Sequence, residues 1–419
     1  MTGVSRRTAV VVFLVFAFAY FLSALLRGVT ATLAPVFSTE LGLRSADLGL
    51  LAGAYFLGFA ALQLPLGRAL DRHGPRRTLL VLLTLAVLGC VAFAQAGSLW
   101  GLIAARALIG AGVAACLMAP LTSYRHLYTP SVQLRANSWM LMTGSLGMVA
   151  ATLPVQWLLP AWGWRGLFWC LAGLLVAAMA LVAWRVPVDA PTDTPTEAST
   201  DAPADASAAA TGQGYVSIAR HPLFLRMAPL GFFVYGGLIA VQALWAGPWM
   251  TRVGGASAGQ AAQGLFIINL AMLLAFMIWG VMMPRLARRG ISAVWLMVRG
   301  LPLCLGLLFI NIALGPAAGA WHWAAWCAAC TFVSVSQPAL GQAFAPAQAG
   351  RALSAFNLVI FGGVFSIQWG MGLLIDAFMG VGWTALQAFR ATFLVFGVCS
   401  VLSYAWFVRR QPAAADNPG

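Results

Sequence analysis

The chain has 419 residues, of which 61% are hydrophobic and 8% are charged. This composition excludes an ordinary soluble globular protein, in which about a quarter of the residues are charged, and it indicates an integral membrane protein. The formal net charge of +14 is typical of a nucleic-acid-binding chain when the chain is soluble, but here the charge follows the membrane segments, and we expect no nucleic-acid partner.

Twelve apolar segments are long enough to cross the roughly 30 Å of bilayer hydrocarbon as helices. In chain order they are residues 9–37, 46–67, 78–97, 99–123, 137–160, 164–186, 224–251, 262–284, 291–314, 320–344, 351–375 and 385–408. The segments predict an all-α integral membrane protein that resides in a lipid bilayer.

The first segment contains a charged residue, Arg27, in the stretch FLSALLRGVTATLAP. In one continuous helix over 9–37, Arg27 lies about 27 Å from the beginning. A charge at the bilayer centre costs about 3 kcal/mol, and a guanidinium fork suits a carboxylate, phosphate or nitrate. We therefore predict that Arg27 binds substrate or lines a cavity. The alternative is that the apolar run ends at Leu26 and that Arg27 reaches the outer membrane surface.

The loop after the second segment reads GRALDRHGPRR from Gly67. Gly67 permits close helix approach, Gly74 permits a tight turn, and Asp71 can accept hydrogen bonds at a helix end or pair with an arginine. The alternative interpretation is a set of charges that only orients the chain in the membrane.

This loop carries a family resemblance. The stretch from Ala54 to Leu80 resembles the G-x-L-a-D-r-x-G-r-r signature of the major facilitator superfamily, and RALIGAGVAA from Arg106 resembles a second element of that family on its fourth helix. The resemblance implies twelve helices in two six-helix repeats, transport by alternating access and no cofactor. It also implies a cytoplasmic gate formed by Gly67, Asp71, Arg72, Gly74, Arg76 and Arg77.

Within that family the chain resembles the organic-anion symporter and nitrate-porter-like branches, in which an arginine on helix 1 binds a carboxylate or oxyanion. Arg27 falls at the corresponding position, although Leu26 stands where those symporters often have an aspartate. The fifth segment, WMLMTGSLGMVAATLP, lacks the Gly-Pro pair followed by Gly-Gly of drug/proton antiporters, which argues against efflux.

A polar stretch from Val186 to Gly214, with five acids and no bases, divides the segments six and six. Such a composition cannot bury an apolar core. We predict an N-terminal bundle (1–186), a disordered acidic cytoplasmic linker (187–222), a C-terminal bundle (223–410) and a cytoplasmic tail (411–419). The two halves also resemble each other in sequence, because GRALDRHGPRR aligns with GVMMPRLARRG from Gly280 at an offset of 213. This similarity indicates parallel repeats.

The basic residues are all arginines, and they are distributed unevenly among the loops. With the N-terminus in the cytoplasm, 17 of the 24 fall inside and four outside. This positive-inside bias predicts that both termini are cytoplasmic, and we expect a multi-pass protein of a bacterial inner membrane.

Uncharged polar residues on several segments are candidates for a binding pocket with Arg27. Each of them can instead bond a neighbouring helix, and Arg106 can be a cavity charge or a structural one. The candidates for substrate binding are Tyr55, Arg106, Gln242, Asn269, Gln337, Asn357 and Gln368, with Trp245 as a wall.

The positions of the acids and cysteines bear on two kinds of chemistry, proton transfer by carboxylates and disulfide formation. Outside the linker and tail only four acids remain, Glu40, Asp47, Asp71 and Asp376, and none is expected at mid-membrane, so a carboxylate proton relay is not visible. We expect Asp376 to pair locally with Arg390. All seven cysteines fall inside the apolar segments, so no disulfide framework is implied.

These features predict a monomeric transporter that imports a small organic or inorganic anion. The anion enters with a proton, in exchange for a counter-anion, or by facilitated diffusion. One alternative is an exporter of hydrophobic or amphipathic compounds, which the aromatic and Met-rich segments allow. The other is a membrane sensor or scaffold, for which the chain offers no signalling domain. Neither a catalytic constellation nor a metal cluster is visible, so we expect no enzyme.

Overall fold

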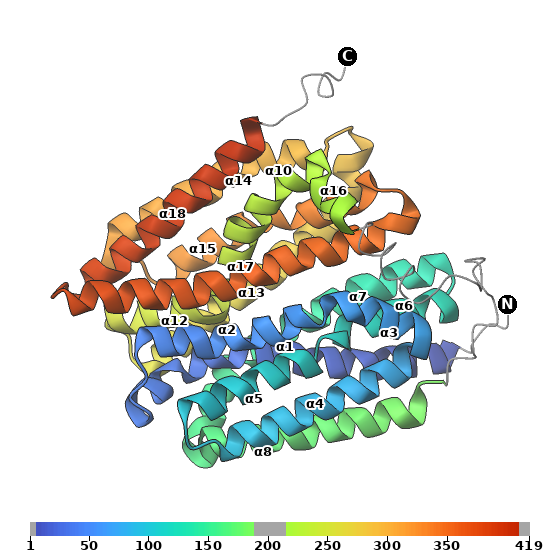
Figure 1. Cartoon of the computed structure of the whole chain (residues 1–419), viewed down its shortest axis with the longest axis horizontal. Helices are drawn as coiled ribbons and strands as arrows, with labels where there is room; N and C mark the ends of the chain where they lie inside the picture. The colour runs from blue at the N-terminus through green and yellow to red at the C-terminus, as the bar shows by residue number, and fades with distance from the viewer. Residues whose placement is uncertain (1–5, 188–214, 410–419) are drawn as a thin grey trace.

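A computed structural model describes residues 6–187 and 215–409 of the chain, and these residues are helical almost throughout. In Figure 1 the helices of the first half, coloured blue to green, lie below those of the second half, coloured yellow-green to red. Most of the expected linker, at 188–214, and the expected tail lie outside the described residues.

The first half begins with one long helix. Its elements are α1 (Arg6–Glu40), α2 (Ser45–Ala61), α3 (Gln63–His73), α4 (Pro75–Gln95), α5 (Leu99–Gly112), α6 (Ala115–Leu127), α7 (Pro130–Ala150) and α8 (Leu153–Arg185).

The second half contains several short helical pieces joined without loops, where π-helical turns (η1 to η3) or 3-10 turns (η4 and η5) interrupt the α-helix. Its elements are α10 (Pro222–Leu230), η1 (Gly231–Tyr235), α11 (Gly236–Ala240), η2 (Val241–Trp245), α12 (Ala246–Pro248), η3 (Trp249–Val253), α13 (Ala258–Arg288), α14 (Ala293–Leu314), η4 (Gly315–Ala317), α15 (Ala320–Cys330), η5 (Thr331–Val335), α16 (Ser336–Ala343), α17 (Pro346–Gly380) and α18 (Ala385–Arg409).

Among the described residues, nine helical stretches are long and apolar enough to cross a membrane, or ten when α2 and α3, which meet at 44°, count as one. Two expected spans remain. Residues 320–343 form the broken run α15–η5–α16. The other corresponds to α7 and the first part of α8, because Gly163 (φ 61°, ψ 171°) divides α8 at the predicted boundary between the fifth and sixth spans. The all-α membrane fold with two repeats is therefore confirmed.

Arg27 lies well inside α1, which continues without a break to Glu40. The first helix therefore continues past Leu26, and an Arg27 that reaches the membrane surface stays the alternative interpretation. We call the end of the molecule where α1 ends and α2 begins the Glu40 end. The opposite end, where α3 ends, is the His73 end.

The two halves meet closely along α2 and α17. A Cβ atom added to Gly49 would lie 2.3 Å from the backbone oxygen of Gln368, and one added to Gly372 would lie 2.3 Å from the backbone oxygen of Ser45. Because any larger residue would clash there, these two glycines let the helices approach backbone to backbone at the Glu40 end.

One expectation about the cysteines is wrong. Cys304 in α14 and Cys330 in α15 form a disulfide, with their Cα atoms 5.1 Å apart. The packing of α14 on α15 brings together two residues that are 26 positions apart in the chain, and neither the spacing nor the composition indicates that contact. Cys327 is buried and free.

Candidate functional site

Arg27 lies between the two halves of the molecule. Its side chain is half-buried and acts electrostatically on two tyrosines, Tyr55 of α2 and Tyr235 of η1. The Arg27 side chain makes no hydrogen bond and no ion pair with any residue that the structure describes. A guanidinium carries five N–H donors, so Arg27 has its full donor set available for a ligand.

One face of α1 organises the polar groups around Arg27. Ser23, Arg27 and Thr30 are spaced by four and three residues, so they lie on the same side of the helix. The Tyr55 hydroxyl donates to the Ser23 carbonyl oxygen at 3.2 Å, and the Arg106 guanidinium donates to the Thr30 hydroxyl. Arg106 lies 5.1 Å from the centre of the Tyr55 ring, within the range of a cation–π contact.

The second half contributes a chain of three polar side chains. The Gln337 amide donates to the Asn357 side-chain oxygen at 2.7 Å, and the Tyr235 hydroxyl donates to the Gln337 side-chain oxygen at 3.5 Å. Gln337 and Asn357 are half-buried. Tyr235 is within electrostatic reach of Arg27, so this chain of bonds extends from α16 and α17 toward the region of α1, α2 and α5.

The other polar candidates lie apart from this chain of bonds. Gln242 of η2 donates to the Asn269 side-chain oxygen at 2.8 Å, and Asn269 donates to the Leu265 carbonyl oxygen at 2.8 Å. Gln368 of α17 is completely buried, and its amide has no hydrogen-bond partner among the described residues. The buried Trp245 indole donates to the Gln368 backbone oxygen at 3.2 Å, so in this conformation Trp245 packs between helices.

The four described acids all lie away from Arg27 and Arg106. Glu40 accepts a hydrogen bond from the Trp164 indole at 2.9 Å, and Asp47 accepts one from the Arg44 backbone at 3.0 Å. Asp71 is exposed at the His73 end. Along their helices, Glu40 is about 20 Å from Arg27 and Asp47 about 12 Å from Tyr55.

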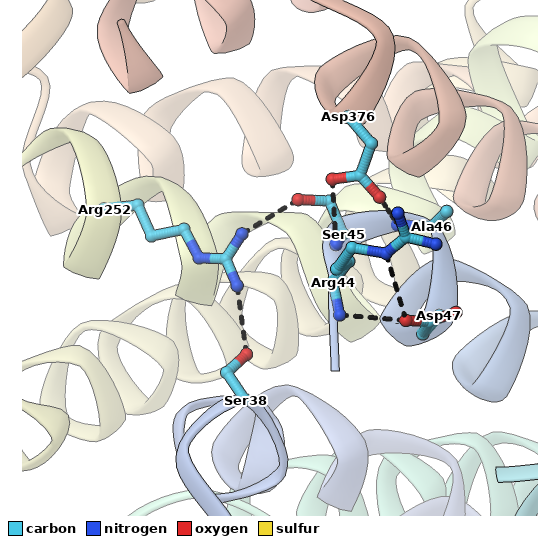
Figure 2. A network of polar contacts seen from close by, with 7 residues as sticks. All are labelled: Ser38, Arg44, Ser45, Ala46, Asp47, Arg252 and Asp376. Atoms are coloured by element: carbon cyan, nitrogen blue, oxygen red, sulfur yellow. Dashed lines mark hydrogen bonds and ion pairs between the residues drawn. The ribbon is translucent and has the colours of Figure 1, made fainter. Parts of the chain in front are cut away.

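The fourth acid, Asp376, joins the two halves at the Glu40 end (Figure 2). Its carboxylate oxygens accept hydrogen bonds from the backbone N–H groups of Ser45, at 3.1 Å, and Ala46, at 2.7 Å. Arg252 of η3 donates to the hydroxyls of Ser45, at 2.8 Å, and Ser38, at 3.0 Å. The Glu40 end is therefore closed by polar contacts between the halves.

The sequence did not identify these contacts, and the expected pairing of Asp376 with Arg390 is wrong. Arg390 instead donates to the carbonyl oxygens of Ile312 and Ala313 at the end of α14. The only sequence signal for Asp376 was its rarity as an acid in this chain.

The predicted gate residues lie at the His73 end, in α3 and at the beginning of α4. Gly74 has a positive φ of 75°, which confirms the tight turn. The expected close approach at Gly67 is wrong in this conformation, because an added Cβ would meet no atom within 4 Å. Asp71 and Arg72 are exposed and make no hydrogen bond or ion pair within the described part of the chain.

The remaining two gate residues differ from each other. Arg76 donates to the Ala183 carbonyl oxygen of α8, within the first half. Arg77 is exposed and borders a groove of about 410 Å³ between α3 and α4. No polar contact like those of Asp376 and Arg252 joins Asp71, Arg72 or Arg77 to the second half among the described residues, so the two ends of the molecule differ in how they are closed.

Comparison with known proteins identifies the family. Residues 16–367 match the family model of the Major Facilitator Superfamily, which is most of the chain. The chain belongs to the major facilitator superfamily. It is accordingly a multi-pass membrane transporter of a small molecule. The membership confirms the family-level resemblance of the 54–80 signature, whereas the resemblance to the anion branches stays a prediction.

One characterised relative is similar in part. The inner membrane transport protein YajR of Escherichia coli (strain K12) is 32% identical over 149 residues, which are 35% of this chain and 32% of that protein. The match therefore spans about a third of the relative's length.

Solved structures share the fold at low identity. A bacterial homologue of the human lysosomal transporter Spinster, in an inward-facing and unoccupied conformation, has a TM-score of 0.72 at 18% identity, with 98% of this chain and 100% of that chain covered. The POT family transporter PepTSo has a TM-score of 0.73 at 15% identity, with 97% of this chain and 98% of that chain covered. A D-xylose–proton symporter has a TM-score of 0.72 at 15% identity, with 96% and 97% covered.

Proposed function

We propose that this transporter imports a small organic or inorganic anion by alternating access, with Arg27 as the group that binds the anion. The observation that carries the proposal is that Arg27 lies at the interface of the halves, half-buried and with its five donors unused by the described residues. A buried or half-buried charge without a partner is costly, and an anionic substrate supplies the partner.

The polar groups around Arg27 supply the rest of the proposed site. In the first half, Tyr55 is within electrostatic reach of Arg27, and Arg106 contacts the Tyr55 ring. In the second half, Tyr235 is within electrostatic reach of Arg27 and bonds to Gln337, which bonds to Asn357. We assign Gln242, Asn269 and Gln368 to later steps of the cycle. Gln242 and Asn269 bond each other here, and Gln368 is enclosed between α2 and α17.

The arginine distribution supports an orientation. Seventeen of the 24 arginines fall on the side that includes the His73 end, and the positive-inside rule places that side in the cytoplasm. Both termini are then cytoplasmic, and the Glu40 end, closed by Asp376 and Arg252, faces outward. In this orientation the described conformation is closed to the outside.

The positions of the four described acids limit how transport can be coupled to a proton. Because none of the four described acids lies beside Arg27, the proposed site has no carboxylate to carry a proton. An anion that brings its own proton, or an exchange of one anion for another through Arg27, requires no such group.

The test compares ligand binding by the wild type and the Arg27→Gln variant. Acetate, nitrate, malonate, sulfate and a lipophilic cation are added to purified protein, and the melting temperature is measured, since a ligand that binds the native state raises it. Loss of a charge-assisted hydrogen-bonded pair should weaken anion binding about 10- to 100-fold. Arg299→Gln is the matched control, because Arg299 is also an arginine within a membrane segment but stacks on Trp295 in α14.

Three results would contradict the proposal in different ways. Equal stabilisation of the wild type and Arg27→Gln by an anion would remove Arg27 from the site. An equal loss of anion stabilisation in Arg299→Gln would show that removal of any positive charge has this effect. Stabilisation by the lipophilic cation alone would instead support the exporter of amphipathic compounds.

A further inference from the structure

A second arginine, Arg106, adjoins the same tyrosine as Arg27. Arg106 is 1% exposed, its guanidinium lies 5.1 Å from the centre of the Tyr55 ring, and it donates to the Thr30 hydroxyl. Its Nε and Nη1 atoms have no hydrogen-bond partner among the described residues. Buried N–H groups of native proteins are nearly always paired, so two unpaired donors on one guanidinium indicate an acceptor that the described residues do not provide.

The register of α1 brings the two arginines to one side of that helix. The Tyr55 hydroxyl is bonded to Ser23 and the Arg106 guanidinium to Thr30, while Arg27 lies between these two positions on the same helix face. Both guanidinium groups act electrostatically on Tyr55. Tyr55 is therefore the common neighbour of two positive charges.

No described acid neutralises either arginine. Glu40 bonds to Trp164, Asp47 to Arg44, and Asp376 to the first turn of α2, while Asp71 is exposed at the opposite end. The charge of this region is therefore +2. A single negative charge would leave one buried guanidinium uncompensated, which is unfavourable in a low-dielectric environment.

We propose that the transported anion carries two negative charges, which Arg27 and Arg106 hold beside Tyr55. This inference rests on the proposed function and specifies its substrate class. Two chemistries meet the requirement, namely a short dicarboxylate and a doubly charged tetrahedral oxyanion such as sulfate or hydrogen phosphate. A planar guanidinium binds the oxygen pairs of both.

The experiment measures the ratio of affinities for matched anions. Melting temperatures of purified wild-type protein are titrated with acetate against malonate and succinate, and with nitrate against sulfate and hydrogen phosphate. Ionic strength is held constant, because salt screens charge interactions. We expect at least one dianion to bind at least tenfold more tightly than its matched monoanion, and the pair that shows the preference identifies the chemistry.

Variants of Arg106 test whether this residue causes the preference for a dianion over its matched monoanion. In Arg106→Gln the dianion should bind no more tightly than its matched monoanion, and this ratio of affinities is measured within the variant itself. Arg106→Lys keeps the charge and should retain part of the preference, which covers the case in which Arg106→Gln fails to fold. Arg299→Gln should leave the ratio unchanged.

The outcomes separate this inference from the proposed function. Anion binding by the wild type with no dianion preference, or a preference that survives in Arg106→Gln, would overturn the dianion inference and leave Arg27 as an anion-binding group. No stabilisation by any anion would overturn the proposed function, and the dianion inference with it.

Discussion

The carboxylate of Asp376 caps the first turn of α2 by accepting the backbone N–H groups of Ser45 and Ala46, although Asp376 and Ser45 are 331 residues apart in the chain. The first N–H groups of a helix have no partner within the helix and carry partial positive charge. A carboxylate of the second half of the transporter satisfies them here. Because the bond joins the two halves, opening of the Glu40 end must break it.

Replacing Asp376 with Asn should favour the open state of the Glu40 end. Asn keeps the shape of the side chain but loses the charge and one acceptor oxygen. Loss of a helix cap costs about 0.5–2 kcal/mol, so the closed-to-open ratio should fall by about 2- to 30-fold. Hydrogen–deuterium exchange of residues 249–253 reports the opening, because the hydrogen bonds of Asp376 within the described part of the chain go to Ser45 and Ala46 and not to these residues.

Asp47→Asn is the control for this variant, because Asp47 lies in the same turn but, among the described residues, bonds only to Arg44. It should leave exchange of residues 249–253 unchanged. If both variants raise that exchange equally, the effect is a general loss of helix stability and Asp376 has no special part in holding the halves together.

Arg252 makes the second contact between the halves, through the hydroxyls of Ser38 and Ser45. A double-mutant cycle of Arg252→Gln with Ser38→Ala measures this bond directly. A hydrogen bond to a charged group contributes about 1.5–3 kcal/mol, and we expect the two substitutions to be non-additive by a large part of that amount. Additive effects on unfolding free energy and on exchange at the Glu40 end would show that the bond does not matter in solution.

Gly372 allows α17 to approach the backbone of Ser45, so Gly372→Ala should force the two helices apart. The added Cβ would lie 2.3 Å from the Ser45 carbonyl oxygen, whereas one added to Gly370, two residues earlier, would meet no atom within 4 Å. We therefore expect Gly372→Ala to raise exchange of residues 43–50 and to lower the transport rate, while Gly370→Ala behaves as the wild type. Equal transport by the two variants would contradict a tight contact at this end.

Much of the fold could be predicted because its signals are local. An apolar run with one charge gave α1 and the position of Arg27, and the loop signature gave the turn at Gly74, where the backbone has a positive φ. The division at Gly163 also followed from the end of an apolar run. Each of these features depends on neighbouring residues in the chain.

The contacts across the molecule could not be predicted in the same way. Asp376 was assigned to Arg390, but the arginine satisfies carbonyl groups at the end of α14 and the carboxylate satisfies a helix of the other half. The Cys304–Cys330 bond depends likewise on how α14 and α15 pack. Tyr235 was missed as a neighbour of Arg27, because one tyrosine in an apolar run has no pattern that marks it.

The two gate glycines should respond differently to substitution. Gly74→Ala places a side chain at φ 75°, a region that costs about 1 kcal/mol or more for residues other than glycine. Gly67→Ala lies within α3 with no atom within 4 Å of the new Cβ, and it should keep or slightly raise stability. Thermal unfolding measures the stability change of both variants. If Gly67→Ala also lowers transport at normal stability, α3 packs more tightly in another state of the cycle.

An acid placed at Gln337 should compete with the substrate for Arg27. The Tyr235 hydroxyl bonds to Gln337, and Tyr235 lies within electrostatic reach of Arg27, so Gln337→Glu adds a negative charge of nearly the same shape beside the proposed site. The charge attracts Arg27 and repels an anion, and at neutral pH we expect anion binding to weaken by about tenfold, or 1.4 kcal/mol. Gln337→Met removes the amide without adding a charge and should weaken binding much less. If the two variants weaken anion binding equally, Gln337 acts through its bond to Asn357. A charge at position 337 then has no electrostatic effect on Arg27.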